Sequence, residues 1–224
     1  MPKAFTEYEK ELISQRLLEQ GYKLFSAHGL RKTNVEEIAR AAGISKGAFY
    51  NFYSSKEALL MDVIEQAEIH ARKELLAAID LPGPSPRARL FTVLKKAFSL
   101  FEAIPILQFF TGSDYDLLFR RIPAEKLQEH LASDRVFFEE LIARCRQAGI
   151  PIQAPLDQIT GLLYLLVLGV LHEDELGQSL FHSNVDLFLE LVAAFCLGEI
   201  EIQLQTPISS APILEEGTHD ELPD

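Results

Sequence analysis

Five neighbouring residues near the N-terminus have the side-chain types that bind DNA. They are Ser45, Lys46, Gly47, Tyr50 and Asn51, spread over the segment SKGAFYN. A lysine ammonium pairs with a backbone phosphate, a tyrosine offers a hydroxyl and a ring, and an asparagine amide has the paired donor and acceptor that match adenine. At helical spacing they lie opposite the apolar residues of the same segment. The segment therefore predicts one helix face that contacts phosphates and base edges.

A preceding helix and a tight turn position this face. Asn34 can cap a helix VEEIARAA, and Gly43 ends that helix because glycine tolerates the positive φ of a tight turn. Ser45 can then cap the next helix, so residues 34–53 form a helix, a turn and a helix. In such a motif the second helix enters the major groove and the first lies across it. The two helix N-termini, at Thr33/Asn34 and at Ser45, also favour a phosphate.

The motif is similar to the N-terminal signature of the TetR (tetracycline repressor) family of bacterial transcription regulators. The resemblance rests on TNVEEIARAAGISKGAFYNFYSSKEALL and the preceding LFSAHGLRKT, and it covers roughly the first 60 residues. It implies phosphate contacts from Thr33, Ser45 and Lys56 and recognition contacts from Lys46, Gly47 and Tyr50. Asn34 departs from the family's more frequent threonine, and Asn51-Phe52 replaces its commoner Tyr-His pair. The predicted DNA-binding residues are Thr33, Asn34, Ser45, Lys46, Gly47, Tyr50, Asn51 and Lys56.

Helical periodicity dominates the whole chain, and no two-residue alternation flanked by hairpin turns is present. The predicted fold class is all-α. The resemblance implies a three-helix DNA-binding head (residues 1–57), joined by a fourth helix to a helical ligand-binding and dimerisation body (residues 58–205). Residues 206–224 form an acidic tail that we expect to be disordered. The expected helices cover residues 6–28, 35–42, 46–53, 56–79, 87–104, 106–121, 124–147, 156–176 and 183–203.

The charge is distributed unevenly along the chain. The formal net charge is −12 at pH 7, yet residues 1–56 hold nine Lys/Arg and six Asp/Glu, a net of +3. The remaining residues therefore carry a net of −15. A mildly basic head on an acidic body indicates a local surface for a polyanion.

Composition argues against several other classes of protein. Residues 158–171 form the longest uncharged apolar stretch, and its 14 residues fall short of the roughly 20 that span a bilayer. We therefore expect a buried helix and no membrane anchor, and the N-terminus lacks the apolar region of a secretory signal. Cys145 and Cys196 stand alone, which argues against a disulfide framework or a structural zinc site and favours the cytoplasm.

The body is rich in aromatic residues. Eleven of the fifteen phenylalanines follow residue 80, and Tyr115 and Tyr164 add hydroxyl groups. Core packing accounts for most of them, but a pocket for an apolar or aromatic effector would use the same set. The sequence does not identify which residues line such a pocket.

Other chemistry finds little support in the sequence. His172 and Glu175 have a spacing that metals can use, but the further ligands of a helical-bundle metal site are missing, so we predict a polar helix end. No metal site, no cofactor and no catalytic constellation is predicted. Three histidines are scattered singly and are predicted to lie at the surface or to be satisfied by neighbours: His70, His130 and His182.

These observations predict a ligand-responsive transcriptional regulator, in first place a repressor. It would bind a near-palindromic operator in double-stranded DNA as a homodimer, and a small apolar effector would release it. The last two expected helices would form the dimer interface. The alternative from another class is a helical-bundle enzyme or small-molecule carrier without regulatory DNA binding. A regulator that activates, or that has no effector, is a third interpretation.

Overall fold

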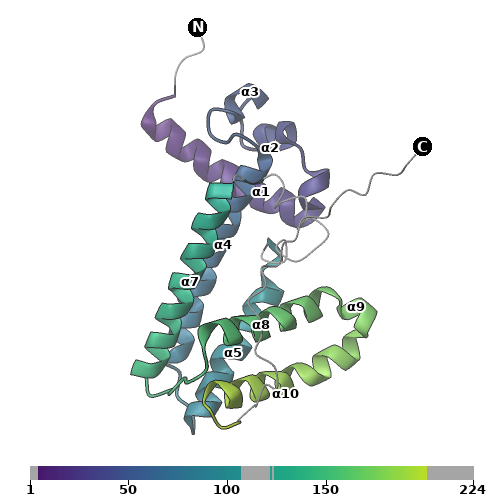
Figure 1. Ribbon diagram of the computed structural model, residues 1–224. Coiled ribbons are helices and arrows are strands. Elements are labelled where there is room, and N and C mark those ends of the chain that lie inside the picture. Colours follow the sequence, from purple (N-terminus) through teal and green to yellow (C-terminus); the bar gives the residue numbers. More distant parts are fainter. Residues whose placement is uncertain (1–4, 107–121, 123, 201–224) are drawn as a thin grey trace, which may run out of the picture.

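The computed structural model describes residues 5–106, 122 and 124–200, and the regular elements among them are all helices. The predicted helix at residues 106–121 and the predicted tail at 206–224 lie outside the described residues, apart from Ile106. The helices are α1 (Glu7–Lys32), α2 (Val35–Ala41), α3 (Lys46–Phe49), α4 (Lys56–Ile79), α5 (Pro86–Ala103), α7 (Ala124–Gln147), α8 (Leu156–Leu171), α9 (Glu173–Leu176) and α10 (Gln178–Cys196). The head (α1–α3) lies at one end of the long helix α4 and the body at the other (Figure 1).

Helix α1 begins at a capping box that joins Thr6 and Glu9. The Thr6 hydroxyl oxygen accepts a hydrogen bond from the Glu9 backbone amide at 3.2 Å, and the Glu9 carboxylate accepts one from the Thr6 backbone amide at 2.8 Å. The sequence predicted an end at His28, but α1 continues to Lys32 across a kink at Gly29. The φ of Gly29 is 76°, a conformation that glycine adopts without a steric penalty. The kink turns the last residues of α1 towards the core, where Leu30 is fully buried.

Helices α2 and α3 follow the predicted local signals, although α3 is shorter than expected. Asn34 caps α2, and the amides of Gly43 (φ 78°) and Ile44 close its end on the carbonyl groups of Arg40 and Ala39. The prediction that the next helix runs to Tyr53 is wrong, because α3 ends at Phe49. Beyond it the amides of residues 51 and 52 bond three residues back instead of four, so the chain continues as tighter turns.

Helix α4 takes part in two separate hydrophobic cores. Near its start, the apolar residues between Leu59 and Ile64 pack with α1–α3 in the core of the head, while Ala78 and Ile79 pack in the core of the body. Gly21 of α1 allows the close approach of α4, since a Cβ atom there would lie 3.1 Å from Cδ2 of Leu59. The predicted boundary between residues 57 and 58 therefore falls inside the first turn of α4, whose next residues still belong to the head core.

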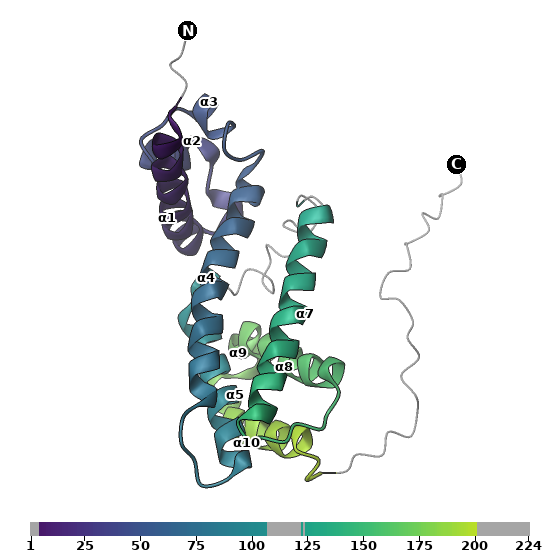
Figure 2. The same ribbon diagram turned by 90° about the vertical axis from the view of Figure 1, so that its left-hand side faces the viewer.

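The body packs α5, α8 and α10 against the lower half of α4 and the C-terminal part of α7 (Figure 2). Arg89 of α5 joins the ends of two other helices. Its guanidinium donates to the carbonyl of Ile79 at 2.9 Å and to that of Ala148, just after α7, at 2.6 Å. A cation here satisfies carbonyl groups that the helix ends leave without partners.

The last helices differ from the prediction in their bounds. A break at His172 divides the expected helix 156–176 into α8 and α9. Helix α10 begins directly after Gly177 (φ 88°), five residues earlier than the predicted start at residue 183. Tyr164 and Leu165 of α8 are exposed in the single subunit. Among the described residues α10 is long and apolar enough to cross a membrane by length and composition alone, but one face of it packs in the body core.

Candidate nucleic-acid interface and interior cavity

Helix α3 presents the predicted DNA-reading residues to solvent at the far end of the head (Figure 1). All five of these residues are exposed: Ser45, Lys46, Gly47, Tyr50 and Asn51. Phe49 fixes the orientation of this face, because its ring is fully buried and packs edge-on against Tyr50 at a centroid distance of 5.6 Å. The prediction that these residues point outward is confirmed, and their contacts with DNA stay a prediction.

Two of the predicted site residues act as helix caps. Ser45 Oγ accepts a hydrogen bond from the Ala48 backbone amide at 3.1 Å, and Asn34 Oδ1 accepts one from the Glu37 backbone amide at 2.9 Å. Each cap uses an acceptor only, so the Ser45 hydroxyl keeps its proton to donate to a phosphate. These caps fix where α2 and α3 begin, and with them the position of the exposed face.

Thr33 does not reach the surface. Its side chain is fully buried, and Oγ1 lies 2.8 Å from the carbonyl oxygen of Gly29 and 3.2 Å from that of Leu24. The hydroxyl is placed to donate a hydrogen bond to carbonyl groups near the end of α1 that the kink leaves without a full set of helical donors. Thr33 therefore offers no side-chain contact to a phosphate in this structure.

Lys56 also bonds inside the head. Its Nζ donates to the carbonyl of Leu30 at 2.6 Å and to that of Thr33 at 2.7 Å. The first residue of α4 thus caps the end of α1 with a positive charge, which the dipole of α1 favours. The predicted phosphate contact of Lys56 is untested, and its ammonium has one N–H beyond these two bonds.

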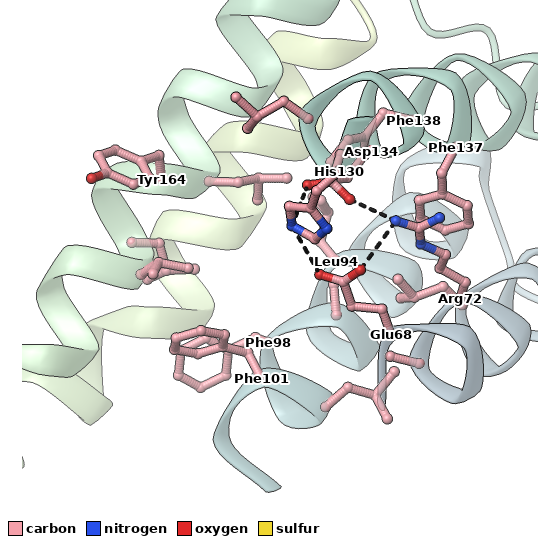
Figure 3. Close-up of a pocket in the computed structure, with 18 of the residues that line it drawn as sticks. Glu68, Arg72, Leu94, Phe98, Phe101, His130, Asp134, Phe137, Phe138 and Tyr164 are labelled. Atoms are coloured by element: carbon pink, nitrogen blue, oxygen red, sulfur yellow. Dashed lines mark hydrogen bonds and ion pairs between the residues drawn. The ribbon is translucent and has the colours of Figure 1, made fainter. Parts of the chain in front are cut away.

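The body contains a cavity of about 430 Å³ between α4, α5, α7 and α8 (Figure 3). Most of its wall is apolar, and it includes aromatic rings of the kind that the sequence predicted for an effector pocket. The aromatic lining residues are Phe98, Phe101, Phe137, Phe138 and Tyr164. Four further aromatic residues of the body lie outside the described residues: Phe109, Phe110, Tyr115 and Phe119.

One end of the cavity carries four charged or titratable side chains. Arg72 donates to Asp134 Oδ1 at 2.6 Å and to Glu68 Oε2 at 3.3 Å. The His130 ring is nearly buried, and its Nε2 lies 3.6 Å from Glu68 Oε1 and 3.5 Å from Asp134 Oδ2. Burial, and then the charge of Asp134, raise the pKa of Glu68 to about 8.

Sequence reasoning missed this group because it treated His130 as an isolated histidine. Two signals were present: Glu68 and Arg72 are four residues apart, and so are His130 and Asp134. Each pair lies on one face of its helix. What no local pattern contains is the packing of α4 on α7 that brings the two pairs together.

The other predicted polar contact has the expected form. His172 Nδ1 lies 2.9 Å from Glu175 Oε2 at an exposed helix end. The two cysteines are buried, and burial raises the pKa of each thiol to about 11. Both thiols are therefore protonated and weakly reactive near neutral pH.

Known proteins resemble the head in sequence and most of the chain in fold. Residues 17–63 match the family model described as bacterial regulatory proteins, tetR family. The HTH-type transcriptional regulator YuxN of Bacillus subtilis, itself uncharacterized, is 32% identical over 133 residues, which cover 56% of this chain and 44% of YuxN. The chain thus spans less than half the length of this curated relative.

Solved structures extend the likeness to the body. The transcriptional regulator FadR from Bacillus subtilis, in complex with stearoyl-CoA, has a TM-score of 0.57 at 19% sequence identity. The match covers 80% of this chain and 97% of the FadR chain. SmeT, the repressor of the Stenotrophomonas maltophilia multidrug efflux pump SmeDEF, has a TM-score of 0.53 at 22% sequence identity. The match covers 81% of this chain and 89% of the SmeT chain. At these identities the likeness establishes the shared fold.

The bonds of Lys56 predict a stability effect. Lys56→Ala should lower the free energy of unfolding by about 1–3 kcal/mol, because two carbonyl groups at the end of α1 lose a charged donor. Lys46→Ala, at an exposed position of α3, should change it by less than about 0.5 kcal/mol. Urea unfolding followed by circular dichroism measures both, and equal stabilities of the two variants would contradict the capping role.

Proposed function

We propose that this chain, which belongs to the TetR family of bacterial regulatory proteins, is a ligand-responsive transcriptional repressor that binds a near-palindromic operator as a homodimer in the cytoplasm. The observation that carries the proposal is the exposed face of α3. The buried Phe49 ring holds this face in its orientation, and α3 lies inside the segment that the family model matches. The proposed contacts are phosphate binding by Ser45 and Lys46, and base reading by Tyr50 and Asn51 with Gly47 allowing close approach.

The acidic body does not prevent this binding. Salt screens charges that are more than about 8 Å away at physiological ionic strength. The head carries a local net charge of +3 in residues 1–56, so it meets the DNA phosphates while the body, with most of the acidic residues, lies towards the other end of α4 (Figure 1). Binding should therefore depend strongly on the few basic residues at the surface of the head.

The dimer proposal rests on an apolar surface formed by α8 and α10. Large apolar side chains are exposed there although they belong to helices whose other faces form the core: Tyr164, Leu165, Leu180, Leu187 and Leu191. Exposed apolar side chains on neighbouring helices are typical of a protein–protein interface. Two helices from each subunit would pack as a four-helix bundle.

The cavity supports the effector proposal. Its wall is mainly apolar and aromatic, which suits a small apolar or aromatic compound. Among the structural neighbours, SmeT is known in a complex with triclosan and FadR in a complex with stearoyl-CoA. For this chain we propose an apolar effector, which would bind better to a body conformation that holds the two heads at another spacing and so reduce DNA binding.

Salt dependence of DNA affinity tests the head contacts. With an operator obtained by selecting bound genomic fragments, Lys46→Ala should weaken binding to all sequences and flatten the plot of log K against log salt. We expect about one unit of slope per lost phosphate contact, hence about two per dimer. Asn51→Ala should relax sequence preference and leave the slope nearly unchanged. An unchanged slope for Lys46→Ala would remove this residue from the interface.

Light scattering tests the dimer surface. Leu187→Glu should yield monomers, because the charge falls at a side chain that is 58% exposed in the subunit. Leu189→Glu is not suitable, since Leu189 is fully buried in the subunit core and the variant would unfold. Lys73→Glu, a charge change on α4 outside the proposed interface, serves as the control. A native protein that scatters as a monomer would contradict the proposal.

A thermal-shift screen tests the effector pocket. Hydrophobic and aromatic compounds should raise the melting temperature, and an active compound should weaken operator binding at the same concentrations. Ala97→Phe places a ring in the cavity and should reduce the shift while leaving DNA affinity without compound unchanged. Stabilisation by polyanionic metabolites alone would overturn the apolar assignment.

A further inference from the structure

The polar end of the cavity has the donor set of a metal site. We propose that Glu68, His130 and Asp134 bind a divalent transition-metal ion, with Zn²⁺ as the representative ion (Figure 3). Imidazole nitrogen and carboxylate oxygen are common ligands of Zn²⁺ in proteins. The inference goes beyond the proposed function, because binding of the ion requires neither DNA nor an organic effector.

The geometry leaves one free oxygen on each carboxylate. Arg72 engages Oε2 of Glu68 and Oδ1 of Asp134, while Oε1 and Oδ2 face His130 Nε2 at 3.6 and 3.5 Å. These separations are long for hydrogen bonds. They are slightly longer than the spacing between ligand atoms around tetrahedral zinc, about 3.3–3.4 Å for bonds of 2.0–2.1 Å. All three ligand atoms lie within 4.8 Å of one another, so small side-chain rotations would bring them around one ion.

The surrounding residues hold this arrangement in place. His130 and Asp134 lie one turn apart on α7, and Glu68 lies on α4, which packs against α7. Arg72 is itself fixed by the Ser133 hydroxyl at 3.0 Å and by the Phe137 ring, whose centroid is 5.0 Å from Cζ. An outer residue that orients ligating carboxylates in this way is a recurrent part of metal sites.

The charges are compatible with a dication. Metal binding would release the proton that Glu68, with its pKa raised to about 8, holds near neutral pH. The two carboxylates, once ionised, and Arg72 sum to −1, so a bound Zn²⁺ leaves a net charge of +1 that an anionic fourth ligand would offset. The three residues line the cavity, so the open coordination position has access to water or to a ligand inside it. The ion would thus add a Lewis-acidic anchor for an oxygen, nitrogen or sulfur donor at one end of an otherwise apolar pocket.

The chain offers a matched control histidine. His182 also lies near two carboxylates, but through different ring nitrogens: Nδ1 is 3.7 Å from Glu102 Oε1 and Nε2 is 2.9 Å from Glu173 Oε2. Opposite nitrogens of one ring cannot bind the same ion. His182→Gln should therefore leave metal binding unchanged, although it removes a histidine beside two acidic residues.

The experiment uses the full chain after treatment with EDTA. Titration with CoCl₂ should give visible absorption typical of four-coordinate cobalt, saturating at one ion per subunit, and ZnCl₂ should displace it. His130→Gln and Asp134→Asn should each weaken Zn²⁺ binding, measured by calorimetry, at least about 100-fold. His182→Gln should bind as the native chain does.

Two results would overturn the inference: no saturable binding to the native chain, or binding that survives both substitutions in the cluster. Thermal unfolding without metal checks that each variant folds. Should His130→Gln fail to fold, Asp134→Asn decides the question, because it keeps the side-chain shape at a half-buried position. Operator binding is measured in parallel, so a lost metal site and a lost regulatory function give separate readouts.

Discussion

Both hydrophobic cores of the described molecule depend on α4, because its two halves pack in different places. The first half is buried with α1–α3 through Leu59, Leu60 and Val63, and the second half reaches the body core through Ala78 and Ile79. Close contact in the head requires that α1 has no side chain at Gly21, where Leu59 and Val63 approach. A change in the tilt of α4 must therefore disturb at least one closely packed core.

This constraint connects the cavity with the DNA-reading face. Glu68 and Arg72 line the cavity from the middle of α4, while Lys56 at its start bonds the end of α1. A ligand that moved the middle of α4 would act on a helix whose first turn is tied to the head by two hydrogen bonds to an ammonium group. Lys56 thus matters for the proposed regulation through its position in the head, apart from any phosphate that it reaches.

The sequence was sufficient where structure depends on neighbouring residues and insufficient where it depends on packing between distant ones. Asn34, Gly43 and Ser45 act through bonds within a few residues, and the pattern placed all three in their observed roles. Thr33 has the residue type of a phosphate contact, but the kink at Gly29 turns the end of α1 towards its hydroxyl. The group around His130 arises only when α4 packs on α7, and single-chain periodicity contains no information on that register.

The exposed leucines of α8 and α10 bear on the lifetime of a newly made subunit. A single subunit presents Leu165 and Leu187 to water, and exposed apolar surface promotes aggregation and brings proteins to chaperones and proteases. In the proposed dimer, pairing removes that surface, so a subunit that finds its partner quickly escapes turnover. The cellular amount of the regulator would then rise more steeply than its rate of synthesis, because survival depends on encounter between two copies.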